Sequence, residues 1–399
     1  MAVDDEVVVV GAGPVGLLNA LGLARAGIPV TVVDRGPAVV DSPRAMVYHW
    51  SVLEGIARLG LLDEALRIGF TKQDYTYLVL ATGERISYSL DVLEGHTPYP
   101  HNLHLGQNRL AEIALRRLAE FPHAQVRWST EVRGLVQDSS GVTLRCEGPE
   151  GAQDVRAAWV IGADGAGSAV RKALGLDFPG MTWPERFVAT NIRYDFETHG
   201  YARSTLLIDP TYGAIIAKID DTGLWRCTYS ESAELPEDGV RDRMSAYFEV
   251  VLPGAPDVEL DAFQPYRMHQ RAAERFRVGR VLLAGDAAHA TNPTGGLGLT
   301  SGLFDTFVLY DAVAAVIRRE AEESVLDRYA EERRRIFLEV ASPAAVENKR
   351  LIYSSHDPER LEADLVKIRR LADEPEVLLE RLMLTARMRS EPLVPVRTS

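Results

Sequence analysis

The sequence predicts an α/β fold in which a discontinuous Rossmann-like domain carries an inserted mixed β-sheet domain and ends in C-terminal helices. Three observations lead to this prediction. Two glycine-rich turns, far apart in the chain, each follow a short and wholly apolar run. Two blocks of alternating polar and apolar residues lie between these apolar runs. Helical patterns then fill most of the chain after residue 303.

The first glycine turn sits inside a βαβ unit. Val7–Val10 is a continuous apolar strand, as expected where helices cover both faces of a sheet. The turn Gly11–Gly16 follows, then a helix from Leu17 to Ala26, which ends at Gly27, a good C-cap. Val30–Val33 is the next strand. The unit has the order that a dinucleotide-binding fold requires.

The residues of this unit fit the dinucleotide fingerprint. Its glycines allow a tight turn and close approach to a pyrophosphate, which would lie on the helix amino terminus. Asp34 ends the second strand, where a carboxylate can accept from ribose hydroxyls and disfavours a 2′-phosphate. The residues assigned here to cofactor binding are Gly11, Gly13, Pro14, Gly16, Asp34 and Arg35.

The first inserted block is predicted to begin with a hairpin. Asp74 to Leu90 alternates around Thr82-Gly83. Gln107–Leu118 then has an amphipathic helical pattern. Three further strands are expected, and they lie over Val126–Val132, Val142–Arg145 and Ala157–Ile161.

The second block contains strands and one helix. The expected strands are Phe187–Tyr194, Ser204–Ile208, Ala214–Ile219, Leu224–Tyr229 and, in the parallel-sheet pattern, Arg280–Ala284. The helix covers Val240–Val251. We therefore expect a dinucleotide-binding domain made of residues 1–72, 103–180 and 275–340, a substrate domain of 73–102 and 181–274, and C-terminal helices with a tail over 341–399.

The second glycine turn follows a buried strand. It places Asp286 at the carboxyl edge of the sheet, where ligands bind. The later glycines permit approach to a flat ring, and a helix beginning near Leu299 would aim its positive end at that ring. The two turns together predict one long ligand held at both ends, which is FAD. The residues assigned to the ring end are Gly285, Asp286, Pro293, Gly295, Gly296, Gly298 and Leu299.

Bulk composition excludes several classes of function. The formal net charge of −13 argues against a nucleic-acid partner. The two cysteines, Cys146 and Cys227, stand in no metal spacing, and no metal site is expected. No apolar run reaches the ~18 residues of a membrane helix, so no membrane partner is expected either. The acidic amino terminus is unlike a secretory signal, and we expect a cytoplasmic protein.

These motifs together resemble the single-component, class A flavoprotein monooxygenases, the para-hydroxybenzoate hydroxylase family. The resemblance spans residue 6 to about 315. Besides the two glycine turns, the segment Asp164–Arg171 matches the family's Asp-Gly motif, which serves FAD and is implicated in NAD(P)H binding. The resemblance implies five more cofactor-binding residues, which are Arg44, Gln107, Asp164, Gly165 and Arg171. Thr300 stands where the family usually has an asparagine, and its hydroxyl is expected to cap the helix.

The resemblance implies a reaction cycle. NADPH or NADH, bound transiently, reduces FAD; O₂ adds to the flavin; and the C4a-hydroperoxide hydroxylates an aromatic small molecule, either a phenol or an aromatic acid. Epoxidation or N-hydroxylation of a non-phenolic substrate stays open. FAD-dependent dehydrogenation without oxygen insertion is the main rival, and a flavin-binding sensor is a further alternative. The protein is expected to be a monomer or a homodimer.

The sequence does not single out a catalytic base. His101 and His104 stand close to Gln107, and Tyr212 and Arg226 lie in the second inserted block. These four are weak candidates for substrate activation, and Arg226 is also a candidate partner for a substrate carboxylate. His289 has no partner at metal spacing, which favours a structural role.

Overall fold

A six-stranded sheet forms one half of the molecule. The computed structural model describes residues 6–41, 45–220, 222–252 and 258–395. The sheet has the order β18-β19-β12-β1-β2-β8, and all its pairings except β18–β19 are parallel. Its strands are β18 (Arg277–Val278), β19 (Val281–Leu283), β12 (Trp159–Gly162), β1 (Val7–Val10), β2 (Val30–Val33) and β8 (Ala124–Arg127).

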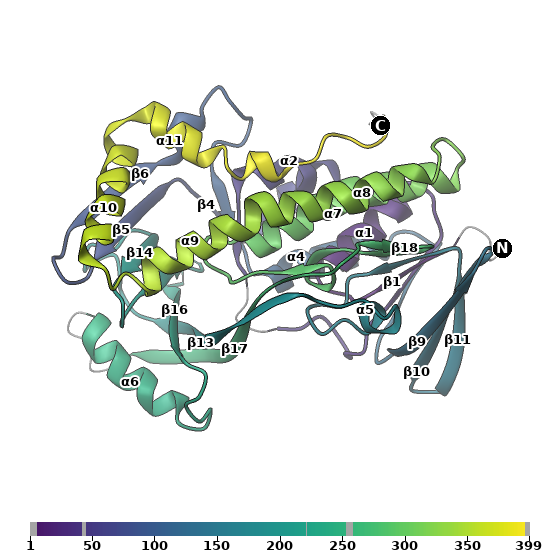
Figure 1. The fold of residues 1–399 in the computed structure, drawn as a ribbon, viewed down its shortest axis with the longest axis horizontal. Coiled ribbons are helices and arrows are strands. Elements are labelled where there is room, and N and C mark those ends of the chain that lie inside the picture. The colour runs from purple at the N-terminus through teal and green to yellow at the C-terminus, as the bar shows by residue number, and fades with distance from the viewer. Residues whose placement is uncertain (1–5, 42–44, 221, 253–257, 396–399) are drawn as a thin grey trace.

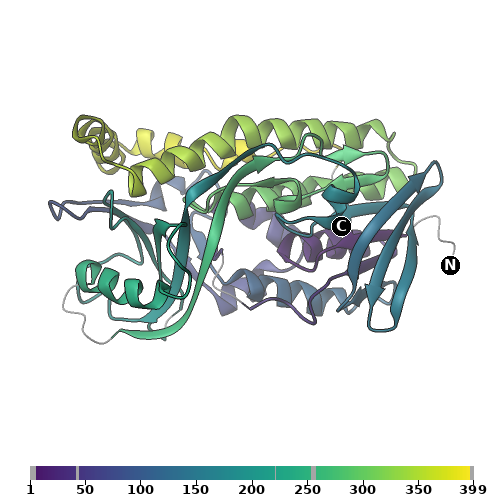
Figure 2. The same ribbon diagram turned by 60° about the horizontal axis from the view of Figure 1, so that its bottom comes forward.

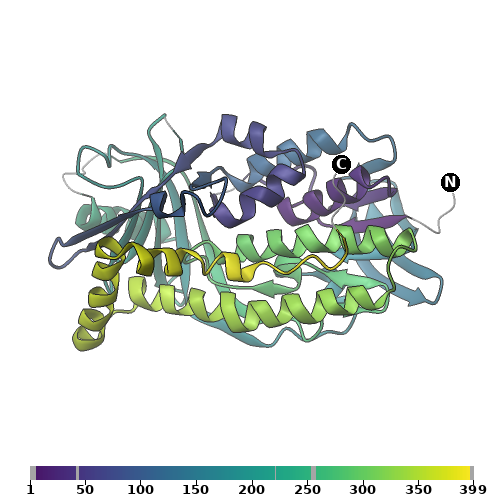
Figure 3. The same cartoon turned by 90° about the horizontal axis from the view of Figure 1, so that it is seen from above.

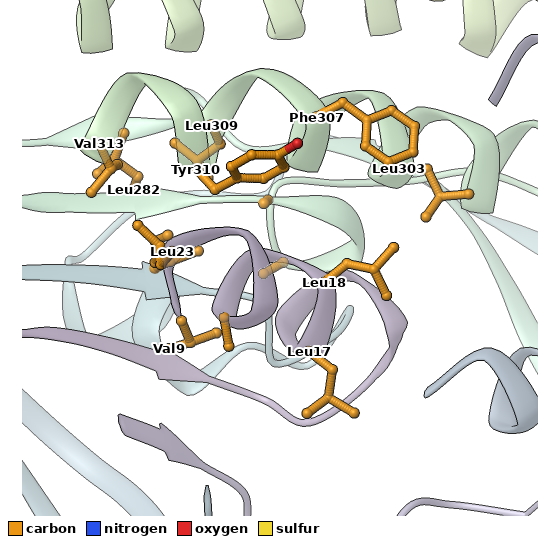
Figure 4. Close-up of a cluster of buried hydrophobic side chains, with 14 of the residues drawn as sticks. Val9, Leu17, Leu18, Leu23, Leu282, Leu303, Phe307, Leu309, Tyr310 and Val313 are labelled. Atoms are coloured by element: carbon orange, nitrogen blue, oxygen red, sulfur yellow. The ribbon is translucent and has the colours of Figure 1, made fainter. Parts of the chain in front are cut away.

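Helix α1 (Pro14–Arg25) packs between α4 (Gln107–Leu118) and α7 (Leu297–Ile317). The contact with α7 is close because α1 carries Gly22 there. A Cβ atom at Gly22 would lie 2.3 Å from the ring of Tyr310. Figure 4 shows the ring of Tyr310 lying between α7 and the apolar side chains of α1. The two helices that follow the two glycine turns are therefore packed directly on each other.

An eight-stranded sheet forms the other half. Its order is β20-β17-β13-β16-β15-β14-β5-β6, and β14–β5 is its one parallel pairing among the described residues. The helix α6 (Val240–Val251) packs on it, at the lower left of Figure 1. The strands are β20 (His289–Ala290), β17 (Glu259–Ala272), β13 (Gly180–Arg193), β16 (Leu224–Ser232), β15 (Ala214–Lys218), β14 (Ser204–Ile208), β5 (Asp74–Val79) and β6 (Arg85–Ser89).

The other strands form two small three-stranded sheets. The sheet β11-β10-β9 extends from the end of the molecule near the amino terminus (Figure 2). The sheet β3-β7-β4 lies within the segments that join the two halves. Their strands are β11 (Gly151–Ala157), β10 (Gly141–Gly148), β9 (Glu131–Asp138), β3 (Val47–Tyr48), β7 (Asn102–His104) and β4 (Phe70–Lys72).

The remaining helices pack on both halves of the molecule. The helix α8, the π-helical turn η4 and α9 run on from one another beside α7 and reach the eight-stranded sheet (Figure 3). α10 and α11 then turn back over β6 and η2. The bounds are α2 (Trp50–Arg58), α3 (Leu62–Ile68), η2 (Leu90–Leu93), α5 (Ala169–Ala173), η3 (Gly285–Ala287), α8 (Ser324–Ile336), η4 (Phe337–Ala341), α9 (Ser342–Tyr353), α10 (Pro358–Asp373), α11 (Pro375–Leu382) and η5 (Ala386–Met388).

The α/β fold class is confirmed, with one difference in detail. The single strand expected over Val126–Val132 is wrong: it is two strands, β8 and β9, separated at Ser129, whose φ is +50°. Helix α7 has the length and mean hydropathy of a membrane span, although Asp305 and Asp311 interrupt its apolar residues. Since 78% of its most apolar window is buried inside the protein, α7 is a core helix. The division into domains at the stated boundaries stays a prediction.

Candidate active site

A cavity of about 1050 Å³ extends from the first glycine turn to the face of the eight-stranded sheet. It is at the upper end of the ~300–1,000 Å³ found for small-molecule sites. Most of the predicted cofactor residues line it, although they come from five separate stretches of the chain. Those lining it are Gly11, Gly13, Pro14, Asp34, Arg35, Gln107, Asp164, Gly165, Gly285, Asp286, Pro293, Gly295, Gly296, Gly298 and Leu299. Gly16 and Arg171 do not line it, and Arg44 lies outside the described residues.

The three glycines of the first turn have different surroundings. A Cβ at Gly16 would lie 1.9 Å from the carbonyl oxygen of Gly11, so Gly16 lets α1 pack on β1. A Cβ at Gly11 would lie 2.4 Å from the carbonyl oxygen of Ala163. A Cβ at Gly13 would meet no protein atom within 4 Å. Gly13 therefore borders open space at the amino end of α1, where a phosphate would be held by free N–H groups.

Asp34 is fixed by the backbone. Its Oδ2 accepts from the amide of Ala12 at 2.6 Å, and its Oδ1 accepts from the amide of Gly36 at 2.7 Å. The carboxylate therefore joins the end of β2 to the glycine turn. It lines the cavity and retains lone pairs for a ribose hydroxyl.

The Asp-Gly segment is organised by its own caps. Asp164 accepts from the Ser168 hydroxyl at 2.5 Å and from the Ala169 amide at 2.6 Å, at the start of α5. Arg171 is 4% exposed and donates to the carbonyls of Ala166 (2.7 Å) and Ala287 (2.8 Å). Arg171 thus lies behind the cavity wall and ties this segment to the second glycine turn.

The second glycine turn rests on a buried carboxylate. Asp305 of α7 accepts from the Gly285 amide at 2.9 Å, from His289 Nε2 at 2.7 Å and from Arg333 Nε at 2.8 Å. Burial alone would raise the pKa of Asp305, but the charges and hydrogen bonds of His289 and Arg333 lower it to about 2. The predicted structural placement of His289 agrees with these contacts, and its ring also stacks on Phe337 at 4.5 Å.

The ring end of the cavity lies at the start of α7. Gly296 is its N-cap, with φ +69°, and no side chain caps the helix. The capping role expected of Thr300 is therefore wrong: its hydroxyl donates to the Gly296 carbonyl at 2.9 Å. His49 Nε2 donates to the Gly295 carbonyl at 2.8 Å, and burial lowers its pKa. No side chain therefore covers the first-turn amides of α7, where Leu297, Gly298 and Leu299 line the cavity.

The sheet side of the cavity is an aromatic chamber. We use this name for the part lined by Tyr75, Tyr77 and Tyr88 of the β5–β6 hairpin and by Trp50 of α2. Leu206, Ile215, Ile352 and Leu382 add apolar walls. Sequence reasoning did not single out these tyrosines. The alternation of β5 was their one signal, since it places Tyr75 and Tyr77 on the same face.

Arg226 is the candidate that the structure does place in the cavity lining. Its Nε and Nη2 donate to Asn191 Oδ1 at 3.1 and 2.9 Å. Burial lowers its pKa to about 10, and Tyr266 acts in the opposite direction. The guanidinium is therefore a cation at neutral pH in the lining of the cavity. Gln264 and His269 of β17 also line it.

His101, His104 and Tyr212 do not line the cavity. His104 is fully buried, and its Nδ1 donates to the Lys218 carbonyl at 3.1 Å. Burial lowers its pKa to about 4, so it is neutral. Tyr212 packs against the cluster under α6 and accepts, through its carbonyl, from the Tyr247 hydroxyl. His101 and His104 are close to Gln107 in sequence, and Tyr212 belongs to the second inserted block. Neither position in the sequence predicted that these side chains lie outside the cavity lining.

The sequence of this chain is similar to a family model and to several known proteins. The family model described as an FAD binding domain matches residues 4–343. The chain is 45% identical over 354 residues to the 6-hydroxy-3-succinoylpyridine 3-monooxygenase of Pseudomonas putida, which covers 88% of this chain and 90% of that protein. It is 44% identical over 364 residues to the para-nitrophenol 4-monooxygenase of Pseudomonas sp. strain WBC-3, with 90% of each chain covered.

Solved structures give the same result. The p-nitrophenol 4-monooxygenase PnpA of Pseudomonas putida DLL-E4 superposes with a TM-score of 0.93 at 42% identity, covering 96% of this chain and 97% of that one. Aklavinone-11 hydroxylase in complex with FAD and aklavinone has a TM-score of 0.78 at 30% identity, covering 88% and 70%.

Proposed function

Because this chain belongs to the FAD binding domain family, we propose that it hydroxylates a phenol or hydroxypyridine at the ring carbon para to the hydroxyl group. The chain is an FAD-dependent aromatic monooxygenase. It takes its electrons from NAD(P)H, as is typical of the family. The proposal concerns which aromatic ring it accepts and which carbon receives oxygen.

The names of two relatives support this position on the ring. In para-nitrophenol 4-monooxygenase, oxygen enters at the carbon that carries the nitro group, para to the hydroxyl. In 6-hydroxy-3-succinoylpyridine 3-monooxygenase, positions 6 and 3 are likewise para, and position 3 carries the acyl group. Both substrates are electron-poor rings with one hydroxyl. We extend this class to the present chain.

The observation that carries the proposal is the aromatic chamber, which is continuous with the cavity at the start of α7. Tyr75, Tyr77 and Tyr88 form an aromatic wall, in which the planes of Tyr75 and Tyr88 are 11° apart, and an aromatic substrate can pack against it. Arg226 supplies a half-buried cation in the cavity lining, which favours an ionised or strongly polar substrate. An electron-poor phenol has a pKa below the ~10 of an ordinary phenol. Its phenolate therefore fits the positive charge of Arg226.

The residues of the chain fit FAD at the other end of the cavity. Gly13 borders space that a Cβ would fill, and Asp34 presents a fixed carboxylate to a ribose. The bound flavin supplies the reduction of O₂ and the transfer of one oxygen atom. The amides at the start of α7 favour negative charge on a bound ring. The apolar walls from Ile352 and Leu382 exclude water from the ring of the substrate.

The test uses the FAD-loaded enzyme with p-nitrophenol, NAD(P)H and ¹⁸O₂. Oxygen entry at the nitro-bearing carbon requires that one p-nitrophenol, one O₂ and one NAD(P)H give one benzoquinone, one nitrite, one water and one NAD(P)⁺. We expect nitrite in a 1:1 ratio to NAD(P)H and ¹⁸O in the quinone. A nitrocatechol product, or NAD(P)H oxidation that yields only hydrogen peroxide, would overturn the proposal. 4-Methylphenol, which lacks an electron-withdrawing group, is the matched control and is expected to give little product.

A cytoplasmic location and a monomeric or homodimeric state remain part of the proposal. Gel filtration of the FAD-loaded enzyme tests the second point directly.

A further inference from the structure

We propose that Gln270 of β17 positions the ring-end loop, residues 291–296, and so sets how much of the oxygen reaches the substrate. All residues of this loop except Asn292 line the cavity. Gln270 itself does not line it, so it is a positioning residue that acts through the loop. The inference rests on the FAD-dependent monooxygenase activity and does not depend on which carbon of the substrate receives oxygen.

The Gln270 side chain holds the loop where the pairing of β17 with β20 ends. Arg271 lies opposite Ala290 in that pairing. The hydroxyl of the next residue, Thr291, donates to Gln270 Oε1 at 3.0 Å. The backbone amide and Nδ2 of Asn292 donate to the same oxygen at 3.3 and 3.2 Å. Because a backbone amide can only donate, its contact fixes which end of the Gln270 side chain is the oxygen.

Asn292 continues this series of hydrogen bonds towards α7. Its side chain is 0% exposed, and its Oδ1 accepts from the Thr294 amide at 3.0 Å. This contact spans Pro293, whose carbonyl accepts from the Gly296 amide at 3.0 Å. Gly296 is the N-cap of α7. The series therefore runs without a gap from Gln270 to the end of α7 that borders the ring site.

The other end of the Gln270 side chain is bonded to α9. Its Nε2 donates to the Ser342 hydroxyl at 2.7 Å and to the Ser342 carbonyl at 3.3 Å. Ser342 is the first residue of α9, and Asn348 and Ile352 of the same helix line the cavity. Gln270 thus joins the ring-end loop to a helix that forms part of the wall on the substrate side.

Loss of these hydrogen bonds should let the ring-end loop and the start of α7 shift together. A shift of about 1 Å in the geometry of a reacting pair costs on the order of a hundredfold in rate. The positive end of a helix also favours the reduced, negatively charged ring over the oxidised one. A displaced loop should therefore change both the fate of the oxygen and the reduction potential of bound FAD.

The experiment uses Gln270→Met in the FAD-loaded enzyme, since methionine keeps the length of the side chain and removes its hydrogen bonds. The first readout is the midpoint potential of bound FAD without substrate. We expect the ratio of affinities for reduced and oxidised FAD to fall about tenfold, which lowers the potential of this two-electron couple by about 30 mV. The second readout is the hydrogen peroxide formed per NAD(P)H with p-nitrophenol present. We expect oxidation of the aromatic ring to slow about tenfold or more. One NAD(P)H, one proton and one O₂ then give one NAD(P)⁺ and one hydrogen peroxide.

Gln137→Met is the matched control, because Gln137 is also half-buried and also bridges two elements. Its Nε2 donates to the Val278 carbonyl at 3.1 Å, and its Oε1 accepts from the Arg280 amide at 2.9 Å. Gln137 does not line the cavity. Its replacement should lower the urea midpoint as much as Gln270→Met does, with the potential and the peroxide yield unchanged. Equal shifts of both readouts in the two variants would overturn the inference, because lost stability alone would then explain them. An unchanged potential in Gln270→Met would overturn it too.

Asn292→Ala tests the series of hydrogen bonds itself. If Gln270 acts through Asn292, the double variant should lose no more than the worse of the two single variants. Shifts in potential that add up in the double variant would contradict this route. The proposed function fails separately: a wild-type enzyme that releases no nitrite from p-nitrophenol would overturn the position of oxygen entry alone, since the potential is measured without substrate. Nitrite release with a potential that does not depend on Gln270 would overturn the present inference alone.

Discussion

Asp305 of α7 and Arg333 of α8 form a buried ion pair, with Nε and Oδ1 2.8 Å apart and side-chain exposures of 0% and 1%. The other oxygen of Asp305 holds the Gly285 amide of the second glycine turn. Arg333 also donates to the Met388 carbonyl (2.7 Å) and to the Ser390 hydroxyl (3.1 Å). The pair therefore joins the ring end of the cofactor site to the carboxyl-terminal segment.

Replacing Arg333 by Met should destabilise the protein strongly. It leaves Asp305 as a buried carboxylate with one cationic partner fewer, and such losses cost about 3–5 kcal/mol. The expected result is a lower urea midpoint together with faster loss of FAD on dilution. Arg335→Met is the control, because Arg335 pairs with Glu339 on the helix surface at 57% and 60% exposure and should cost about 0.5 kcal/mol or less. Equal costs for the two variants would contradict a central role of the buried pair.

Much of the fold could be predicted because strand and helix patterns are local. The helices Gln107–Leu118 and Val240–Val251 have the bounds that the pattern predicts. The strand β17 was not singled out, because its residues alternate weakly and pair with β13 across a long stretch of chain. The break at Ser129 also has no sequence signal, since a non-glycine residue rarely takes a positive φ.

The candidate site could be predicted only where a motif is contiguous. The glycine turns lie together because each follows a strand of the same sheet. The aromatic chamber is different: Trp50, Asn102 and Tyr75 come from three elements, and their contacts depend on the pairing of β7 with β3 and β4. The same pairing buries His104, although it stands three residues from Gln107 in sequence. No local pattern carries that information.

Alanine at Gly13 should separate cofactor binding from folding. A Cβ there meets no protein atom within 4 Å, so the apoprotein should keep its stability. The same Cβ would occupy the space of the pyrophosphate, and FAD affinity should fall about a hundredfold, or about 2.7 kcal/mol. Flavin fluorescence on titration of the apoprotein measures the affinity, and urea unfolding measures the stability.

The partner variant is Gly16→Ala, whose Cβ would lie 1.9 Å from the Gly11 carbonyl oxygen. It should lose stability in the apoprotein, because α1 must move away from β1. A stable Gly16→Ala protein with unchanged FAD affinity would show that this backbone contact is relaxed at no cost. Full FAD affinity in Gly13→Ala would place the pyrophosphate elsewhere.

Asn at Asp34 should weaken FAD binding. The side chain now accepts from the Ala12 and Gly36 amides with separate oxygens, and an asparagine would turn an N–H₂ group towards one of them. We expect affinity for FAD to fall about tenfold or more, measured by the same titration. Asp138→Asn is the control. Its carboxylate also accepts from two backbone amides, those of Ser140 and Gly141, but does so in an exposed hairpin. If both variants bind FAD equally well, Asp34 has no part in the site.

Replacing Lys72 by Met should stabilise the protein below pH 8. Burial lowers the pKa of Lys72 to about 8, from an ordinary value of 10.5, despite the nearby Asp74. Between these two values the unfolded chain binds more protons than the folded one, so this lysine makes stability rise with pH. Below that window its charge opposes folding by about 3 kcal/mol. The stability difference between Lys72→Met and wild type should therefore be largest at pH 7.5 and shrink as the pH approaches the upper end of the window.

Urea unfolding at several pH values checks this difference. Taking the difference between the two proteins removes the buried tyrosines, which titrate in the same range in both. Lys367→Met serves as the control, since Lys367 is 75% exposed and should give a small difference that does not depend on pH. A stability difference for Lys72→Met that stays constant from neutral to alkaline pH would mean that Lys72 keeps its ordinary pKa.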